Sequence, residues 1–497
     1  MKPKTDLATS SRATKMHLNK YYVYFFAGVS LLYALPFILH SNLYLDDVYR
    51  SVYGDGSWSP LGRPLADMIT FGLSLNRFYL SDFYPLGIII AIIIFTCIIY
   101  FIIEKELSVI SGYALIPLPT LFASPIFLQN MSYHYDSTAM TIALSLGVLA
   151  FYLSCSRGVF YNILSIISLI ASLSLYQPCA NIFLGLMAAN IIIKIKNSNN
   201  LKLKQCILDS VLFCCSFLIY YLFVVKLFSL GGQRASFIEP SNIISSLMLA
   251  LKGACNISSL ILTGFMKIVF HILVASAAIS IIAVIIKMKP SFSDLSSALL
   301  RFSLSIILLF FSAIGTSFLV VEGITDIRVM VGLSSVVFFL LVIALRELNL
   351  KASFALVSFI LLPVVSLSFQ YVNASSYQRD FELSILTNVS RDVDYGANGS
   401  VYISGTMPLS PQAKVAINAV PFIGRVMPPS PPWVSRRLAV SAGINSIENS
   451  WGGDNLDLIS KVCDENLRPL IANHLYSIYK ISDKTLVYFK GNSNICD

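Results

Sequence analysis

The most informative part of the chain is Leu43–Ile69, LYLDDVYRSVYGDGSWSPLGRPLADMI, which follows the first long apolar run. It places two carboxylates, Asp46 and Asp47, side by side. Only 12% of the 497 residues are charged, so this concentration of charge in one segment is unusual. Adjacent carboxylates raise each other's pKa unless a cation or a hydrogen-bond donor lies nearby. The segment is therefore either a solvated loop with a helix cap or a functional site, and we favour the site.

The composition indicates a polytopic membrane protein. Hydrophobic residues make up 56% of the chain and the mean hydropathy is +0.74, which is more apolar surface than a soluble chain can bury. The sequence has no Rossmann glycine fingerprint, no P-loop and no nucleic-acid-binding module. The net charge of +9 is a sign of membrane topology, because the basic residues cluster in loops.

Eleven segments are long and apolar enough to cross a bilayer, which takes about 20 residues per helix. The predicted spans are residues 21–40, 85–103, 110–130, 137–155, 159–176, 178–195, 207–228, 263–287, 302–321, 329–346 and 352–370. We expect Pro117, Pro119 and Pro125 to kink the third span. Segments 59–83 and 229–262 mix polar with apolar residues, so each is predicted to contain a helix that lies in the outer membrane interface.

The charges on the connections predict the orientation in the membrane. Basic connections alternate with connections that are poor in lysine and carry acidic residues. The basic set includes Lys105, Lys204, Lys287, Arg301, Arg346 and Lys351, and the acidic set includes Asp46, Asp47, Asp136, Glu239 and Asp326. This is the positive-inside pattern. It predicts a cytoplasmic tail at residues 1–20 and an outer first loop at residues 41–84.

Residues 371–497 have the composition of a soluble segment, and an odd number of spans places them outside. We expect a helix at residues 376–393 and strands at residues 401–404 and 485–489. The segment is long enough for one small α+β domain, and it contains no catalytic motif.

Two pairs of residues in this C-terminal segment carry specific expectations. Cys463 and Cys496 lie outside the apolar runs that hold most of the other cysteines, so they could form a disulfide in an oxidising compartment. Arg436 and Arg437 follow a proline-rich stretch and are predicted to lie on the solvated surface.

Further polar groups converge on the predicted outer face. They are Asp46, Asp47, Arg50 and Arg63 in the first loop, Tyr133, His134 and Asp136 between the third and fourth spans, Tyr176 and Gln177 between the fifth and sixth, and Glu322, Asp326 and Arg328 between the ninth and tenth. Ionisable residues at membrane depth are costly and tend to mark function. A carboxylate can accept a hydroxyl proton, aromatic rings suit sugar rings, and arginine matches phosphate oxygens. The set predicts a site that handles sugars and a phosphate.

Some of these residues also fit simpler roles. Asp136 precedes an apolar run and is typical of a helix cap, a role that we favour over catalysis. Arg328 fits an interfacial anchor about as well as a phosphate ligand. His134 has no second histidine nearby, so a zinc site is not expected. Asp46, Asp47 and Asp136 form no compelling cage for a divalent cation, so no metal and no other cofactor is predicted.

A series of motifs extends over nearly the whole chain. Tyr44-x-Asp46-Asp47-x-x-Arg50 follows the first span, and Trp58 and Gly62-Arg63-Pro64-Leu65 precede a predicted interfacial helix. The tip at residues 133–136, the break at residues 174–178 and a polar C-terminal region follow. This arrangement resembles the GT-C glycosyltransferases, and most of all the serotype-converting O-antigen glucosyltransferases, the Gtr family of Gram-negative bacteria and their temperate phages.

The resemblance implies a GT-C-like bundle of about eleven transmembrane helices, with periplasmic interfacial helices and a small α+β periplasmic domain. It implies a location in the bacterial inner membrane and a site at the periplasmic face. The donor would be undecaprenyl-phosphate-glucose and the acceptor a lipid-linked O-antigen. A companion flippase and a donor-making synthase are implied as partners.

We therefore expect an inverting hexosyltransferase that uses a polyprenyl-phosphate sugar. Asp46 or Asp47, with a preference for Asp46, is the expected general base. Arg328 and Arg63, with Arg50, are the expected ligands of the donor phosphate. The expected substrate-binding residues are Tyr44, Trp58, Tyr133, His134, Asp136, Tyr176 and Gln177.

Two alternatives remain open from the residues alone. A flippase or another transporter of lipid-linked sugars also has many helices, and it predicts charged residues deep inside spans and a symmetric repeat of broken helices. The sequence shows the ionisable residues gathered at one face instead. An enzyme of the same class could also transfer mannose, galactose or aminoarabinose, because only the resemblance indicates glucose.

Overall fold

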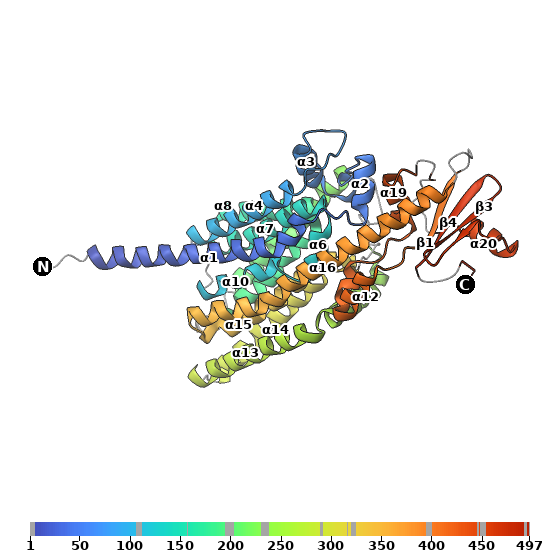
Figure 1. Cartoon of the computed structure of the whole chain (residues 1–497). Coiled ribbons are helices and arrows are strands. Elements are labelled where there is room, and N and C mark those ends of the chain that lie inside the picture. The colour runs from blue at the N-terminus through green and yellow to red at the C-terminus, as the bar shows by residue number, and fades with distance from the viewer. Residues whose placement is uncertain are drawn as a thin grey trace.

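The computed structural model is a long helical bundle with a small sheet domain at one end (Figure 1). The described chain begins beyond the opposite end of the bundle. The structure describes residues 5–105, 112–156, 158–193, 203–229, 238–288, 292–315, 317–319, 325–393, 400–444, 447, 454–491 and 495–496.

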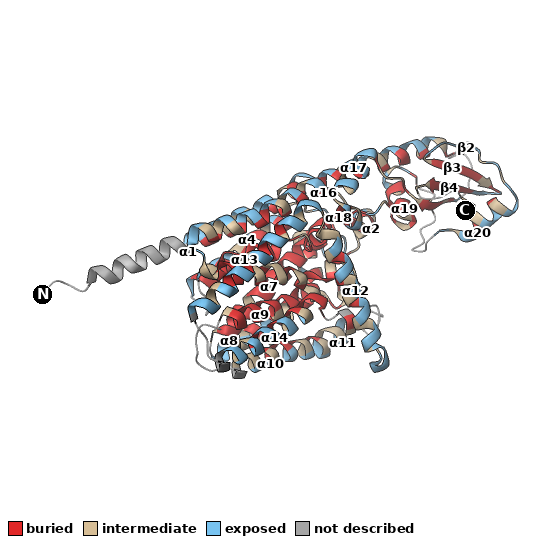
Figure 2. Cartoon of the chain, turned by 90° about the horizontal axis from the view of Figure 1, so that it is seen from below, coloured by how far each residue is buried: buried red, intermediate tan, exposed pale blue. Residues whose placement is uncertain are grey.

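Sixteen of the helices in these described ranges precede the sheet domain. They are α1 (Thr5–Leu39), α2 (Asp46–Tyr53), α3 (Pro64–Leu73), α4 (Leu86–Glu104), α5 (Pro119–Phe122), α6 (Leu128–Ser132), α7 (Asp136–Cys155), α8 (Val159–Tyr176), α9 (Ile182–Ile193), α10 (Leu203–Ile219), α11 (Lys226–Phe228), α12 (Ile243–Ile261), α13 (Gly264–Met288), α14 (Phe292–Ile314), α15 (Ser334–Ala344) and α16 (Leu350–Asp392). α7 is enclosed by the other helices, because 89% of its most apolar 18-residue stretch is buried. It lies inside the bundle in Figure 2.

Nine helical stretches among the described residues have the length and composition of membrane spans, so the chain is a polytopic helical membrane protein. The prediction of eleven spans differs from this count for identifiable reasons. Residues 110–130 and 329–346 form short helical pieces instead of long helices, and three prolines interrupt the first of these segments. Residues 159–193 count as one stretch, although the chain reverses within it.

The reversal within residues 159–193 follows from contacts with α7. Ser172 Oγ of α8 donates to the carbonyl of Ala143, and Asn190 Nδ2 of α9 lies 3.7 Å from Cys155 Sγ. α8 therefore runs antiparallel to α7, and α9 runs parallel to it. The 3₁₀ turn Gln177–Asn181 joins them, so the predicted break after Tyr176 is present.

α12 was predicted as an interfacial helix, yet it is the ninth stretch with the length and composition of a span. Figure 2 shows it crossing the outer ends of the bundle helices. Ser246 near its start donates to the carbonyl of Phe318, and Gly253 lies against Thr325 and Met330. These partners all belong to connections at one end of the bundle, so the position of α12 fits the predicted interfacial orientation.

Two predicted boundaries are replaced by longer helices. α1 begins at Thr5, so residues predicted to form an irregular tail continue the first span as helix. α16 runs without interruption from Leu350 to Asp392 and carries the chain from the bundle into the sheet domain. The predicted division at residue 371 therefore lies inside a helix.

Buried ionisable residues lie inside candidate spans, contrary to the prediction that such residues gather at one face, and Arg301 and Asp209 are examples. Arg301 lies in the span Leu295–Ile314 and is 6% exposed. The predicted span began only at residue 302, which placed this arginine in a loop. Asp209 lies in the span Gln205–Phe228, is 1% exposed, and accepts a hydrogen bond from Gln205.

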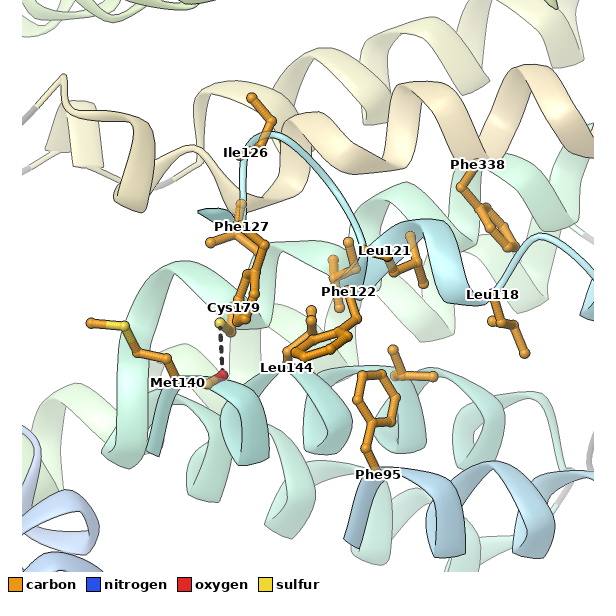
Figure 3. Close-up of a cluster of buried hydrophobic side chains, with 14 of the residues drawn as sticks. Phe95, Leu118, Leu121, Phe122, Ile126, Phe127, Met140, Leu144, Cys179 and Phe338 are labelled. Carbon is orange, nitrogen blue, oxygen red and sulfur yellow. Dashed lines mark hydrogen bonds between the residues drawn. The ribbon is translucent and has the colours of Figure 1, made fainter. Parts of the chain in front are cut away.

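A cluster of aromatic and aliphatic side chains fills the bundle beside α7 (Figure 3). Phe122 packs edge-on against Phe95 and tilted against Phe127, with ring centroids 6.2 and 5.5 Å apart. Cys179 donates through its Sγ to the carbonyl of Met140 at 3.4 Å. Since lipid tails are as apolar as these side chains, van der Waals packing drives such contacts. The cluster fixes the turn after Tyr176 against the first half of α7.

The sheet domain has four strands in the order β1-β4-β3-β2. Its elements are β1 (Val401–Thr406), α17 (Pro411–Ala419), α18 (Pro421–Val426), α19 (Pro432–Ser441), α20 (Leu456–Asp464), β2 (Ile471–Ala472), β3 (Tyr476–Ile481) and β4 (Lys484–Lys490). β1 pairs with β4 in parallel, whereas the other pairs are antiparallel. One core of the domain combines strand residues with the end of α16, α19 and Val48 of α2. The predicted strands correspond to β1 and β4.

The two specific expectations for this segment have opposite outcomes. Cys463 and Cys496 form a disulfide, as predicted. The prediction that Arg436 and Arg437 are solvated is wrong, since they are 2% and 1% exposed. Arg436 donates to the carbonyl of Ile403. Both arginines lie on α19, which packs between β1 and α2.

Candidate active site

The first outer segment is held between the bundle and the sheet domain. Tyr44 donates through its hydroxyl to the carbonyl of Val426 at 2.6 Å, and Arg379 Nη2 of α16 donates to the carbonyl of Leu43 at 2.7 Å. Leu45 has a φ of 44°, a region that a leucine rarely adopts and that costs about 1–3 kcal/mol. Contacts on both sides thus fix the start of α2, where Asp46 and Asp47 lie.

Asp47 is a buried anchor of this segment. It has 0% exposure, and its Oδ2 accepts hydrogen bonds from the backbone N–H groups of His134 (2.7 Å) and Tyr44 (3.1 Å). Its Oδ1 accepts a longer bond, 3.3 Å, from the N–H of Tyr135. Burial and the nearby Asp136 charge raise the pKa of the Asp47 carboxyl to about 8. Asp47 therefore ties α2 to the start of α7, and its placement disfavours contact with a substrate.

Asp46 differs from its neighbour in being accessible. Its side chain is 42% exposed, and its Oδ2 lies 3.9 Å from Arg328 Nη1. Burial lowers the pKa of the Arg437 guanidinium, and the charge of Asp46 is one of the smaller influences that raise it. Asp46 is thus a carboxylate with solvent access beside two arginines, and the geometry favours it over Asp47 as a base.

Arg328 lies in the 3₁₀ turn Ile327–Val329, and several groups fix it in place. Its backbone N–H donates to Gln129 Oε1 at 2.8 Å, and its carbonyl accepts from the Tyr176 hydroxyl at 2.9 Å. Its guanidinium donates to the Tyr133 hydroxyl and lies over the Tyr133 ring. The side chain is still 20% exposed. Arg328 is therefore a positioned cation with an open side, as a phosphate ligand requires.

Arg63 is fixed close to the same place. Its Nε donates to Gln177 Oε1 at 2.8 Å, and its guanidinium lies 4.6 Å from the centre of the Tyr176 ring. Burial lowers the pKa of Arg63, and the charge of Arg328 lowers it further, against the opposite influence of Tyr176. The charge of Arg328 thus opposes the protonation of Arg63, which places the two cations in one region. Such a place suits an anion.

Arg50 and Asp136 are committed to each other. Arg50 Nη1 lies 3.0 Å from Asp136 Oδ2, the two side chains are 10% and 8% exposed, and Asp136 Oδ1 accepts a hydrogen bond from Trp58 Nε1 at 2.6 Å. The Arg50 guanidinium lies 4.4 Å from the centre of the Trp58 ring. Asp136 makes no side-chain cap at the start of α7, so the favoured interpretation as a helix cap is wrong. This buried trio favours a structural role over contact with the donor phosphate.

The aromatic residues predicted to receive sugar rings are enclosed instead. Tyr44, Trp58, Tyr133 and Tyr176 are 7%, 1%, 1% and 2% exposed. Their faces are covered by arginines, as for Trp58 and Tyr176, or by other rings, as for Tyr44 against Tyr133 at 4.8 Å. The structure therefore corrects the expectation of open aromatic faces. These rings hold the arginines in position.

His134 and Gln177 also serve the surrounding structure. His134 Nε2 lies 2.7 Å from Asp82 Oδ1, and its ring stacks on Tyr84 with centroids 4.0 Å apart. Burial lowers the pKa of His134, more than its hydrogen bond to Asp82 raises it. Gln177 Nε2 donates to the Tyr220 hydroxyl and to the carbonyl of Leu61.

Two residues of this region were not singled out from the sequence, and a third, Arg437, was assigned to the solvated surface. Gln129 binds both Arg328 and Tyr44, and its polar side chain within an apolar run was a usable signal. Arg425 of α18 pairs with Asp326 at 3.0 Å and links the sheet domain to the connection that carries Arg328. Arg437 reaches Asp46 only through the tertiary fold. Glu322, which the sequence analysis grouped with Asp326 and Arg328, lies outside the described residues.

The described residues contain no group of three or more histidine, cysteine, aspartate or glutamate side chains that could hold a metal ion. The carboxylates nearest the arginines are instead paired with those arginines or with backbone N–H groups. The arrangement as a whole offers one accessible carboxylate beside a pair of fixed arginines. It can accept a proton and hold a phosphate within the same small region.

Comparisons with known proteins add a family. Residues 35–339 match the family Glucos_trans_II, described as Glucosyl transferase GtrII. The chain is 25% identical over 422 residues to a protein of Salmonella phage P22 described as an uncharacterized 55.3 kDa protein in the gtrB 5' region, and the alignment covers 82% of this chain and 87% of that relative. No solved structure matches the chain.

Proposed function

Because this chain belongs to the GtrII glucosyl transferase family and is a membrane-embedded glycosyltransferase, we propose that it transfers glucose from undecaprenyl-phosphate-glucose to a sugar of the lipid-linked O-antigen. The enzyme would be of the GT-C type, act with inversion at the anomeric carbon, and lie in the bacterial inner membrane with its site at the periplasmic face. The product would be a modified O-antigen, as in serotype conversion. A flippase and a donor synthase would supply the donor lipid.

The observation that carries this proposal is the contrast between the carboxylates around Arg328 and Arg50. Asp47 is enclosed by backbone N–H groups and Asp136 by Arg50 and Trp58. Among these three, Asp46 has the accessible carboxylate, with 42% of its side chain exposed. It lies beside Arg328, which keeps an open side. A base and a phosphate-binding cation at this spacing match the needs of transfer from a lipid phosphate sugar.

The proposed step needs only groups that this site holds or the substrates bring. Asp46 accepts the proton of an acceptor hydroxyl while that oxygen forms a bond to the anomeric carbon of the donor. The bond between that carbon and the phosphate oxygen breaks, and the polyprenyl phosphate leaves with the electron pair. Arg328 and Arg63 stabilise the charge on the departing phosphate. Because a phosphate is a weak base, the leaving group requires no strong general acid.

Two observations support the proposed orientation. The connections that carry Asp46, Asp136 and Asp326 meet at one end of the bundle, whereas Lys287 pairs with Glu347 at the other, and the basic connections belong to the cytoplasm by the positive-inside rule. The sheet domain at the acidic end contains a disulfide, which persists in an oxidising compartment such as the periplasm.

The decisive experiment is reconstitution of the purified chain with donor lipid and lipid-linked O-antigen. We expect covalent incorporation of glucose into the acceptor, detected by mass spectrometry, and no incorporation with Asp46→Asn. Offering polyprenyl-phosphate mannose, galactose and aminoarabinose in parallel tests the sugar. If labelled donor crosses the bilayer without any covalent product, the protein is a transporter of lipid-linked sugars and the proposal fails.

Labelling tests the orientation separately. Ser51 lies on the exposed side of α2 and Lys351 at the start of α16. In a background whose free cysteines are replaced by serine, we expect Ser51→Cys to react with a membrane-impermeant maleimide applied from the periplasm. Lys351→Cys should react only after the inner membrane is opened. The reverse pattern would leave the proposed site without access to its acceptor.

A further inference from the structure

A second feature lies at the opposite end of the bundle from Asp46. A cavity of about 350 Å³ opens between α9, α13, α14 and α15. Its walls are mostly apolar, with Ile281 and Ile285 from α13, Leu295 and Leu299 from α14, and Val342 from α15. Its volume is in the range of ligand sites.

Two arginines interrupt the apolar wall. Arg301 projects from α14 and is 6% exposed, and Arg346 follows α15. Arg301 lies within a stretch that has the composition of a membrane span. Ionisable side chains at that depth are rare because they are expensive to desolvate, and they tend to mark binding or transport. None of the groups proposed for glucosyl transfer lies at this end of the bundle.

The charged side chains among the described residues that line the cavity, Arg301 and Arg346, are both basic. Lys287 pairs with Glu347 at the end of α13, so this acidic residue already has a basic partner besides the two arginines. Arg346 Nη2 is buried and has no hydrogen-bond partner among the described residues. An unsatisfied buried N–H is costly, and an anion in the cavity would satisfy it. The walls therefore favour a ligand that is anionic at one end and apolar along its length.

We propose that this cavity binds the headgroup of an anionic phospholipid of the cytoplasmic leaflet. Arg301 and Arg346 hold the phosphate by charge-assisted hydrogen bonds, and an acyl chain lies along α13 and α14. Exposed apolar residues continue from the cavity over the outer surface of these helices, at Ile281, Ile285, Leu295 and Leu299. The cavity is thus continuous with a surface that already faces lipid. The binding of the lipid is independent of the proposed glucosyl transfer, and only the choice of leaflet rests on the proposed orientation.

Native mass spectrometry of the full chain, released from detergent, tests the proposal. Phosphatidylglycerol, phosphatidylcholine of the same acyl chains, undecaprenyl phosphate and inorganic phosphate are titrated in parallel. We expect at least one phosphatidylglycerol to be retained, roughly tenfold more tightly than phosphatidylcholine, because the choline cation of the latter offsets its phosphate charge and is repelled by the two arginines. Equal retention of the two phospholipids overturns the proposal. So does a preference for undecaprenyl phosphate or for inorganic phosphate.

Variants locate the site. Arg301→Gln and Arg346→Gln should each weaken phosphatidylglycerol retention roughly tenfold, and Arg301→Lys should restore part of it. Lys351→Gln is the matched control, because Lys351 is an exposed basic residue near the same end that does not line the cavity. If Arg301→Gln fails to fold, Arg346→Gln alone decides the outcome. Unchanged retention in Arg346→Gln, or an equal loss in Lys351→Gln, refutes the assignment.

Discussion

The two ends of the bundle both place arginines against apolar surroundings, but the groups around those arginines differ. At the outer end Arg50 lies beside Asp136 and Arg328 beside Asp46, while Arg63 is held by Gln177. At the other end Arg301 and Arg346 line an apolar cavity. Pairing with carboxylates fixes cations in position for chemistry, whereas cations in an apolar wall favour the binding of an amphiphile.

The outer end contains two kinds of carboxylate, and this difference is what makes it a candidate for catalysis. Asp47 and Asp136 are buried and fully used by their neighbours, while Asp46 is exposed. A single accessible carboxylate within a framework of buried ones is the arrangement expected when the framework positions a base. The predictions below separate the accessible group from its framework.

The largest expected effect is on the rate of transfer when Asp46 is replaced. Removal of a general base costs about 10²–10⁴-fold in rate. We expect Asp46→Asn to lower kcat by that factor, measured with reconstituted protein, and to leave the thermal stability within about 0.5 kcal/mol, as is usual for exposed positions. Lys351→Gln at the opposite end should leave the rate unchanged. Full activity in Asp46→Asn would show that Asp46 is not the general base, and the outer end would then lack the catalytic group that distinguishes it from the other end.

The next effect concerns the framework. Asp136→Ala leaves the Arg50 guanidinium buried without its partner, which costs about 3–5 kcal/mol of stability. We expect a clear drop in the apparent Tm of the detergent-solubilised protein. The matched control is Asp326→Ala, because Asp326 pairs with Arg425 at the surface with both side chains more than a third exposed. Such pairs contribute about 0–1 kcal/mol. A stable but inactive Asp136→Ala would place Asp136 in the chemistry instead.

Many of the groups at the outer end, and much of the fold, could be predicted from the sequence. The motif around Asp46 and Asp47, the outer arginines and the break after Tyr176 were all located there, because charge in an apolar chain and a proline after a polar pair are local signals. The length of the apolar runs also predicted most spans, and runs of β-branched and aromatic residues predicted β1 and β4. These features depend on residues that are close in the sequence.

What the sequence could not provide depends on tertiary contacts. Whether Asp46 or Asp47 is buried depends on the N–H groups of His134 and Tyr135, which belong to another segment. The enclosure of the aromatic rings and the burial of Arg437 likewise follow from how α7 and α19 pack against α2. Arg301 was assigned to a loop because a window of apolar residues cannot reveal that a helix continues past a charge.

A smaller effect is expected at Arg328. If its guanidinium stabilises charge on the departing phosphate, Arg328→Gln should lower kcat by about 10²–10³-fold with a smaller change in KM. Arg328→Lys keeps the charge but loses the planar fork, so it should recover only part of the rate. Arg425→Gln, a change in a surface pair near the same connection, is the comparison. A rise in KM alone for Arg328→Gln would show that this arginine binds ground state and transition state equally.

The last expected effect is the dependence of stability on pH through Asp47. Its pKa is raised in the folded protein to about 8, against about 3.9 for an unfolded aspartate. The folded state therefore binds this proton more tightly, so the stabilisation is complete below about pH 4 and is lost as the pH rises toward 8. The slope is at most about 1.4 kcal/mol per pH unit.

Substitution of Asp47 tests this dependence directly. In Asp47→Asn the amide oxygen can still accept from the N–H groups of Tyr44 and His134, which bind Oδ2 at present, while the amide nitrogen replaces Oδ1 with its long bond to Tyr135. We expect apparent Tm values close to those of the wild type near pH 5 and higher than those of the wild type at pH 8. Asp47→Ala should instead be destabilised at every pH, because it leaves buried N–H groups unpaired. If Asp47→Asn follows the wild-type pH profile, the carboxylate is already ionised when buried, and the framework at the outer end is charged throughout.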